Sequence, residues 1–152
     1  MNKIYIIGPV GSGKTTLARK LSKQLNIKFY ELDKVVWDDD NGNIKRSVEE
    51  INSLFNNIIN QESWIIEDVG RNCFKKGRDK ADVVYYLKLK PITIYYRIIK
   101  RWIKQKIGIE KYNYKPTIKS LIELLNWVKS DLKNQKLKIK ELEKYNLIIL
   151  KK

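Results

Sequence analysis

The chain has 152 residues, of which 43% are hydrophobic and 32% are charged, and its formal net charge is +15. This length fits one globular domain, and the apolar content is too high for a disordered chain. With no histidine and one cysteine, Cys73, the sequence excludes histidine catalysis and a structural zinc site. No apolar run approaches the roughly 20 residues that cross a bilayer, and the N-terminal run is too short for a signal peptide. We therefore expect a cytoplasmic protein that does not enter the membrane.

The positive charge lies almost entirely in the second half of the chain. Residues 1–70 carry 9 Lys and Arg against 10 Asp and Glu, whereas residues 71–152 carry 23 against 7. Such asymmetry is typical of a surface that faces phosphates or nucleic acid. Lysine outnumbers arginine 26 to 6, so a compositional bias toward lysine is an alternative explanation of the same excess.

Short apolar runs alternate with amphipathic segments from the N-terminus onward. The β-branched run 3–7 predicts a buried strand that stops at Gly8. Leucines at helical spacing predict a helix that follows the glycine-rich turn and ends near Asn26. We expect a second strand over 28–33 and then a polar loop over 38–43.

The next segment carries a clear helix start. Ser47 and Glu50 have the spacing of a capping box, in which each side chain bonds the backbone N–H of the other residue. The inner face of this helix is predicted to carry its apolar residues, Ile51, Leu54, Phe55, Ile58 and Ile59.

Strands and helices continue to alternate up to the end of the chain. Further strands are predicted over 64–66, 83–89 and 147–150. Helices are predicted to start at Pro91, with a break near Gly108, at Pro116–Thr117, and in the charged segment before the last strand. The alternation predicts a three-layer α/β/α fold with a mainly parallel sheet, in one domain over 1–152.

The strongest motif is the phosphate-binding loop GPVGSGKT at residues 8–15, which matches G-x-x-x-x-G-K-[ST] in full. Its glycines let successive backbone N–H groups curl around phosphate oxygens. Lys14 is expected to reach the β- and γ-phosphates of ATP, and the Thr15 hydroxyl to ligate Mg²⁺. The nucleotide-binding residues are predicted to be Gly8, Gly11, Ser12, Gly13, Lys14, Thr15 and Thr16.

Other P-loop classes lack their signatures in this sequence. There is no Asn-Lys-x-Asp element for guanine and no Leu-Ser-Gly-Gly-Gln element of a transport ATPase. A chain of 152 residues also has no room for a multi-lobed motor. A compact phosphotransferase of the nucleotide-kinase type remains.

Beyond the loop, the segments ELDKVVW at 31–37, WIIED at 64–68 and ADVV at 81–84 complete a family pattern. With them the chain resembles the adenylate kinase-related P-loop proteins, and most of all the group of DNA topology modulation proteins. The resemblance implies a five-stranded parallel sheet in the order 2-3-1-4-5 and an acceptor site beside the P-loop. It also implies a small basic lid, which we place at about 102–118.

Three carboxylates near predicted strand ends are candidate site residues. In related small-molecule kinases a carboxylate at the place of Asp33 orients the acceptor hydroxyl or takes its proton; a solvated or helix-capping aspartate is the alternative. Glu67 and Asp68 follow the third strand, where one carboxylate normally holds the Mg²⁺ shell, and we favour Glu67 slightly. Trp37 could stack on a base or fill the core.

Three arginines are candidates for neutralising charge during transfer. Arg71 follows Glu67 by four residues, where the resemblance places an arginine on the acceptor phosphate. Arg97 and Arg101 match an arginine pair that lies beside the adenine and phosphates at the base of the lid. Residues 97–119 carry eight Lys and Arg against Glu110 alone, which suits a lid over a charged transition state. Further basic residues after the lid are lysines rather than the arginines usual in such kinases.

The sequence thus predicts a kinase that uses ATP and Mg²⁺. Its acceptor is expected to be a nucleoside or nucleoside monophosphate, with a sugar-like hydroxyl metabolite as the second candidate. The alternative is an ATP-binding regulator that lies on nucleic acid through the basic half. Tyr112 and Tyr114 in the basic lid could stack on bases or pack the edge of the lid. Both a monomer and a dimer fit. The predicted catalytic residues are Lys14, Asp33, Arg71, Arg97 and Arg101, and the predicted metal ligands are Thr15 and Glu67 or Asp68.

Overall fold

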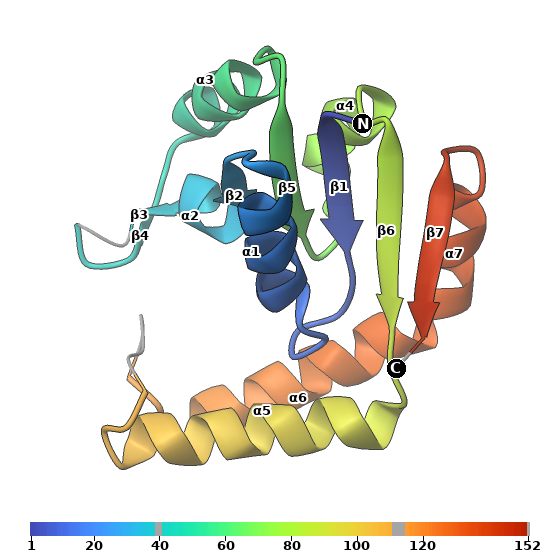
Figure 1. Ribbon diagram of the computed structural model, residues 1–152. Coiled ribbons are helices and arrows are strands. Elements are labelled where there is room, and N and C mark those ends of the chain that lie inside the picture. The colour runs from blue at the N-terminus through green and yellow to red at the C-terminus, as the bar shows by residue number, and fades with distance from the viewer. Residues whose placement is uncertain (39–40, 111–114, 152) are drawn as a thin grey trace.

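The computed structural model describes residues 1–38, 41–110 and 115–151. Its central sheet has five parallel strands. The strands lie side by side in the order β2-β5-β1-β6-β7 (Figure 1). Counted within this sheet alone, that order is 2-3-1-4-5 along the chain. Their bounds are β1 (Lys3–Ile7), β2 (Phe29–Glu31), β5 (Trp64–Asp68), β6 (Val83–Lys88) and β7 (Leu147–Lys151).

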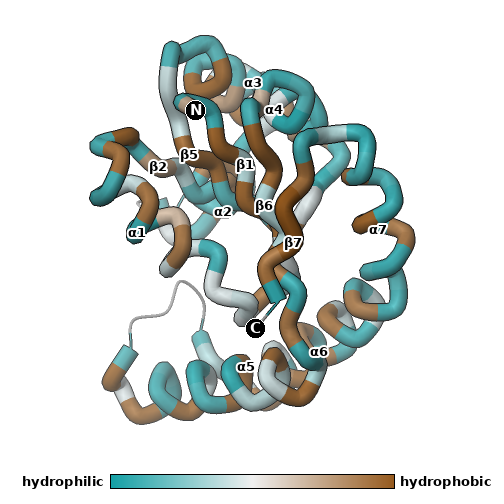
Figure 2. Tube along the Cα trace, turned by 45° about the vertical axis from the view of Figure 1, so that its right-hand side comes forward, coloured by the Kyte–Doolittle hydropathy of each residue, from teal (hydrophilic) through white to brown (hydrophobic). Residues whose placement is uncertain are grey.

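Helices cover both faces of the sheet, which confirms the three-layer fold class. One layer holds α1 (Lys14–Leu25), α5 (Pro91–Lys106) and α6 (Ile118–Lys133), which pack around Ile4 and Ile6 of β1. The opposite layer holds α2 (Leu32–Val36), α3 (Val48–Ile59), α4 (Lys75–Asp79) and α7 (Gln135–Leu142), which pack around Tyr5 and Ile7. β1 is buried on both faces from Ile4 to Ile7, and its isoleucines give the strand its hydrophobic colour in Figure 2.

The helix after Ser47 begins as predicted but turns slightly different residues inward. The Ser47 hydroxyl accepts from the Glu50 backbone N–H at 3.2 Å, and the Glu50 carboxylate accepts from the Ser47 N–H at 2.9 Å. Phe55 is buried together with Ile58 and Ile59, whereas Leu54 is 40% exposed. The prediction that Leu54 faces inward was wrong, because the buried stripe runs along the neighbouring positions of the helix.

Two strand ends differ from the prediction, and both differences affect the candidate site. The second strand ends at Glu31, so Asp33 lies in α2 rather than at a strand end, because Leu32, Val35 and Val36 bury one helical face. The third strand continues through Glu67 and Asp68, since both residues pair with the last residues of β1. A small antiparallel hairpin, β3 (Trp37–Asp38) with β4 (Ile44–Lys45), flanks the expected polar loop.

The helices α5 and α6 run beside each other below the sheet in Figure 1. The Trp102 indole N–H donates to the Thr117 carbonyl at 3.2 Å, which ties the end of α5 to the start of α6. The predicted lid includes this joint, although its residues 111–114, with Tyr112 and Tyr114, lie outside the described residues. Within the described ranges, no helix has the length and apolar character needed to cross a membrane.

Candidate active site

The glycine-rich loop joins β1 to α1 at the carboxyl end of the sheet. Gly11 and Gly13 have φ angles of 76° and 94°, in the left-handed region that a side chain would strain. Lys14 is the first residue of α1, and its Nζ donates to the Pro9 carbonyl at 3.0 Å. The lysine side chain therefore folds back over the loop, where a bound phosphate would meet it. Thr16 is exposed on α1, and Ser12 is buried with a hydroxyl that has no hydrogen-bond partner in the described part of the chain.

The Lys14 side chain is buried, and its ammonium group lies near several carboxylates. Burial lowers the pKa of Lys14, while the charges of Glu67 and Asp33 oppose that shift. No ion pair of Lys14 with a carboxylate is found among the described residues. A buried cation of this kind gains most from an anionic partner, which a nucleotide phosphate would provide.

Thr15 and Glu67 come together from α1 and β5. The Thr15 hydroxyl donates to Oε1 of Glu67 at 2.8 Å. Burial raises the pKa of Glu67, whereas the Lys14 charge and the Thr15 hydrogen bond lower it. A hydroxyl beside a carboxylate fits Mg²⁺, which takes few protein ligands and completes its shell with water and phosphate oxygens. The described residues contain no cluster of three or more His, Cys, Asp or Glu side chains that could hold a metal ion.

Asp68 has other partners and is less suited to a metal. Its side chain is 0% exposed, and Oδ2 accepts from the backbone N–H groups of Gly70 at 2.8 Å and Arg71 at 2.6 Å. Its Oδ1 accepts from the Arg71 guanidinium at 2.6 Å. Because these bonds occupy both oxygens, the geometry favours Glu67 as the metal-side carboxylate.

Arg71 bridges two carboxylates that belong to different elements. One nitrogen of its guanidinium binds Asp68, and the other binds Asp33 on α2. Burial disfavours the Arg71 cation, but the nearby Asp68 and Asp33 together raise its pKa. The Asp33 side chain is 65% exposed, so the bridge fixes its orientation and leaves it open to solvent. Arg71 therefore holds an acidic residue in place, rather than standing unpaired for an acceptor phosphate.

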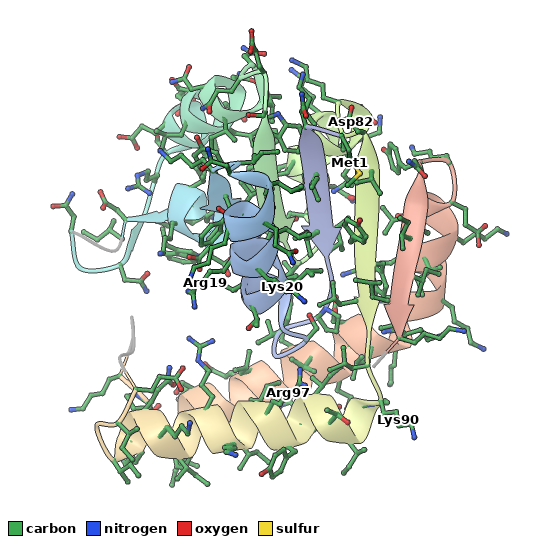
Figure 3. All side chains as sticks on the ribbon, viewed as in Figure 1. Met1, Arg19, Lys20, Asp82, Lys90 and Arg97 are labelled. Carbon is green, nitrogen blue, oxygen red and sulfur yellow. The ribbon has the colours of Figure 1, made fainter. Side chains whose placement is uncertain are left out.

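The arginine pair of α5 is divided between two places. Arg97 donates to the carbonyl oxygens of Gly11 and Ser12, each at 3.3 Å, and Figure 3 shows it rising from α5 toward the P-loop. Arg101 is 61% exposed and pairs with Glu110 at 3.0 Å near the end of α5. Arg97 thus contacts the P-loop, whereas Arg101 belongs to the base of the predicted lid.

The structure also places residues that the sequence did not single out. A cavity of about 270 Å³ lies between the turn after β5 and the two C-terminal helices. Lys138 of α7 reaches this turn, where it donates to the Val69 carbonyl at 3.4 Å and pairs with Asp131 of α6. One lysine in a lysine-rich helix carries no sequence signal for such a contact. Trp37, by contrast, is 38% exposed and does not fill the core.

Comparisons with known proteins place the chain in a family. Residues 4–115 match the AAA domain family. Shikimate kinase of Marinomonas sp. (strain MWYL1) is 32% identical over 78 residues, which cover 51% of this chain and 33% of that protein. Shikimate kinase of Buchnera aphidicola subsp. Schizaphis graminum (strain Sg) is 44% identical over 78 residues, covering 51% and 35%. The chain thus spans about a third of the length of these curated relatives.

Solved structures share the fold at low sequence identity. Shikimate kinase from Acinetobacter baumannii in complex with shikimate aligns with a TM-score of 0.65 and 15% identity, covering 100% of this chain and 84% of that one. A gluconokinase from Sinorhizobium meliloti 1021 aligns with a TM-score of 0.57 and 13% identity, covering 99% and 82%. The fold is therefore that of the P-loop kinases, and with residues 4–115 matched the chain belongs to the AAA domain family.

Proposed function

We propose that the protein is a kinase that uses ATP and Mg²⁺ and transfers the γ-phosphoryl group to a hydroxyl of a small acceptor. One observation carries the proposal: a single edge of the sheet brings together Lys14, the Thr15–Glu67 pair and the oriented carboxylate of Asp33. The similarity to proteins named shikimate kinase and gluconokinase supports it, since shikimate and gluconate both carry hydroxyl groups.

Each group has a distinct task in this proposal. The P-loop N–H groups and the N-terminus of α1 bind the phosphates, and Lys14 neutralises the charge of the transferred group. Thr15 and Glu67 would hold Mg²⁺, which supplies further charge neutralisation when bound. Asp33 orients the acceptor hydroxyl and accepts its proton, while Arg71 keeps the carboxylate in place. Arg97 holds the P-loop through hydrogen bonds to its carbonyl groups, and Arg101 neutralises charge from the base of the lid.

The surroundings of Asp33 favour one class of acceptor over another. A nucleoside monophosphate would bring its phosphate toward an exposed carboxylate whose arginine partner is already paired with two acids. The negative charges of the phosphate and of Asp33 would repel each other, whereas a hydroxyl group would donate a hydrogen bond to Asp33. We therefore place acceptors that present a hydroxyl group to Asp33, sugar-like molecules and nucleosides among them, ahead of nucleoside monophosphates, which would present a phosphate.

The finer expectations from the sequence remain predictions. They include the DNA topology modulation group, one domain over 1–152, a lid at about 102–118, and the nucleic-acid regulator. The regulator is supported by the basic second half of the chain alone. The relatives named above are small-molecule kinases by name, so we rank it below the kinase.

ADP release in the presence of Mg²⁺–ATP tests the proposal across nucleosides, nucleoside monophosphates, polyols and sugar acids. We expect stimulation by at least one phosphate-free hydroxyl acceptor and none in Lys14→Ala. Lys20→Ala, which removes an exposed lysine from the same helix, is the matched control and should retain activity. Stimulation by nucleoside monophosphates alone would overturn the acceptor class, and stimulation by no acceptor would argue against a kinase.

A further inference from the structure

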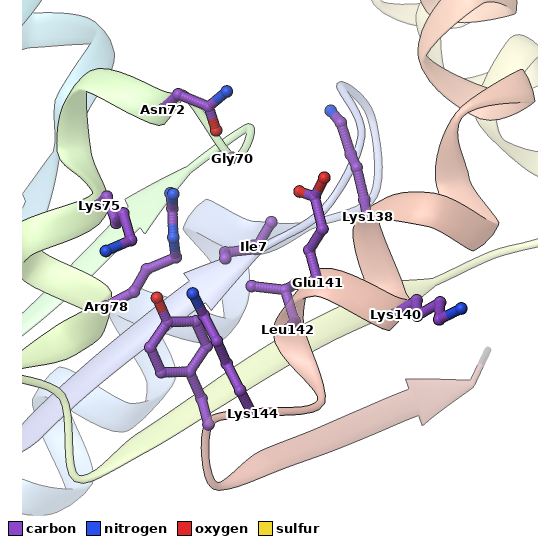
Figure 4. A pocket seen from close by; sticks show the side chains of 11 residues that line it. Ile7, Gly70, Asn72, Lys75, Arg78, Lys138, Lys140, Glu141, Leu142 and Lys144 are labelled. Carbon is purple, nitrogen blue, oxygen red and sulfur yellow. The ribbon is translucent and has the colours of Figure 1, made fainter.

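A second cavity, of about 300 Å³, lies between α4 and α7 next to the turn at Gly70 (Figure 4). Its inner wall is Ile7, the last residue of β1. The charged residues that line it are five cations and one acid: Lys75, Arg78, Lys138, Lys140, Lys144 and Glu141. Positive charge therefore outnumbers negative charge around this half-open space.

Arg78 is the member of this set that is hardest to explain without a ligand. It is 6% exposed, and one guanidinium nitrogen donates to the Arg71 carbonyl at 2.9 Å. No ion pair among the described residues involves Arg78. The hydroxyls of Tyr5 and Tyr145 lie near its charge; burial raises the pKa of each hydroxyl, and the Arg78 charge opposes that shift. A buried cation is costly unless an anion pairs with it.

The other cations differ in whether their charge is matched. Lys138 pairs with Asp131, and Lys75 pairs with Asp79 at 3.4 Å. Lys140 and Lys144 are exposed at the cavity and form no ion pair with a described residue. The cavity therefore combines a buried guanidinium that has no ion pair among the described residues with two exposed lysines. The Lys144 ammonium lies 5.1 Å from the centre of the Tyr145 ring, and the Lys140 side chain extends outward in Figure 4.

We propose that this cavity binds the phosphate group of a small phosphorylated metabolite. A guanidinium presents a fork of donors that fits phosphate, and lysine arms add charge without fixed geometry. The Asn72 amide adds a polar group, while Ile7 and Leu142 offer an apolar wall to the organic part. The Tyr145 hydroxyl at the same cavity donates to the Asp79 carboxylate at 2.7 Å. A volume of about 300 Å³ is at the lower end of ligand pockets. The proposal goes beyond the kinase and does not require ATP at the P-loop.

The phosphate could arrive by two routes with the same chemistry. This cavity and the one beside Arg71 share Gly70 and Lys138, so an acceptor held near Arg71 could extend a phosphate into it. A separate metabolite could also fill it as an effector.

The test is a titration of the ¹⁵N-labelled protein with inorganic phosphate, followed residue by residue by NMR. The P-loop also binds phosphate, so shifts at Gly11 and Gly13 report on that site separately. Saturable shifts at Gly70, Asn72 and Tyr145 are expected for the new site, and they should persist in Lys14→Ala. Their absence in the wild type would overturn the proposal, whatever the P-loop signals show.

Variants that remove equal charge at different places distinguish a specific phosphate site from a general attraction of phosphate to the basic surface. Lys140→Gln with Lys144→Gln should weaken the second set of shifts about tenfold. Lys133→Gln with Lys136→Gln removes the same charge from exposed residues that do not line the cavity, and should change the affinity less than about twofold. Equal weakening in both pairs would contradict a built site. Arg78→Gln, where it folds, should remove the shifts altogether.

The kinetic arm identifies the source. If added inorganic phosphate raises the acceptor KM without changing kcat, the two compete, and the cavity then binds a group of the acceptor. Binding without such competition shows a separate metabolite.

Discussion

The P-loop edge of the sheet and the α4–α7 cavity are neighbours that handle charge in opposite ways. At the P-loop edge, Arg71 contacts two carboxylates, and the Glu67 carboxylate accepts a hydrogen bond from the Thr15 hydroxyl. In the cavity, five cations face one acid, and the buried Arg78 pairs with no described carboxylate. Paired groups hold a fixed geometry, which suits chemistry, whereas unpaired buried charge favours binding a counter-ion.

The comparison is most sharply tested at Lys14, the one buried cation of the P-loop edge without an ion pair in the described chain. Lys14→Ala should reduce ATP-dependent turnover by at least about 100-fold, because it removes the charge that meets the transferred phosphoryl group. ADP release measures the loss, and circular dichroism checks that the fold is retained. Turnover like that of the wild type would contradict the role of the P-loop.

Asp33 is expected to show the next largest effect. Asp33→Asn should lower acceptor phosphorylation by about 100-fold, the usual range for loss of a positioned base. Nucleotide affinity should change less than about threefold, since Asp33 contacts Arg71 rather than the loop. Phosphorylation rates and nucleotide titration measure the two effects, and an equal loss of both would remove the acceptor role of Asp33.

Glu67→Gln is expected to separate metal binding from stability. The variant should weaken nucleotide binding about tenfold with Mg²⁺ and much less without it. Because burial raises the pKa of Glu67 in the folded protein, ionisation destabilises the fold as pH rises from the unfolded pKa through the folded one. The variant should therefore be the more stable form at neutral pH, and this advantage should vanish near pH 4.

Urea unfolding at several pH values, together with titration with and without Mg²⁺, measures both parts of that prediction. Glu62→Gln, an exposed carboxylate outside the site, is the control. A wild type that is more stable than Glu67→Gln at neutral pH would show that the carboxylate has a stabilising partner in the apo protein.

Arg71→Lys should give the smallest effect at the P-loop edge. A lysine keeps the charge but cannot bridge Asp33 and Asp68 with the two nitrogens of one guanidinium. We expect the acceptor KM to rise about tenfold with a smaller change in kcat, because Asp33 loses its orientation rather than its charge. Steady-state kinetics at saturating ATP measure it. A loss of nucleotide affinity instead would place Arg71 on the nucleotide side.

Local patterns in the sequence predicted the parts of the molecule that local physics determines. The strand 3–7, the P-loop and the Ser47–Glu50 capping box depend on residues that are close in sequence. The end of the third strand depends on distant residues, because Glu67 and Asp68 extend it by pairing with residues of β1 that lie 61 positions earlier in the chain. Asp33 was misplaced because burial of α2 against the sheet outweighed the strand pattern.

The same distinction separates the site residues that were predicted from those that were missed. Lys14, Thr15 and Glu67 carry a motif or follow a strand, and the structure brings them together. The Arg71–Asp33 bridge and the Lys138–Val69 contact join residues 38 and 69 positions apart. Nothing in one sequence indicates such pairs, since each depends on how two elements pack.

The most direct test of the account is calorimetric titration of the wild type and of Lys14→Ala with a non-hydrolysable ATP analogue, with and without Mg²⁺. The account predicts a single site that binds more tightly with Mg²⁺ and is weakened at least about 100-fold in Lys14→Ala. Absence of binding by the wild type, or equal affinity in both proteins, would contradict the claim that this edge of the sheet is a nucleotide site.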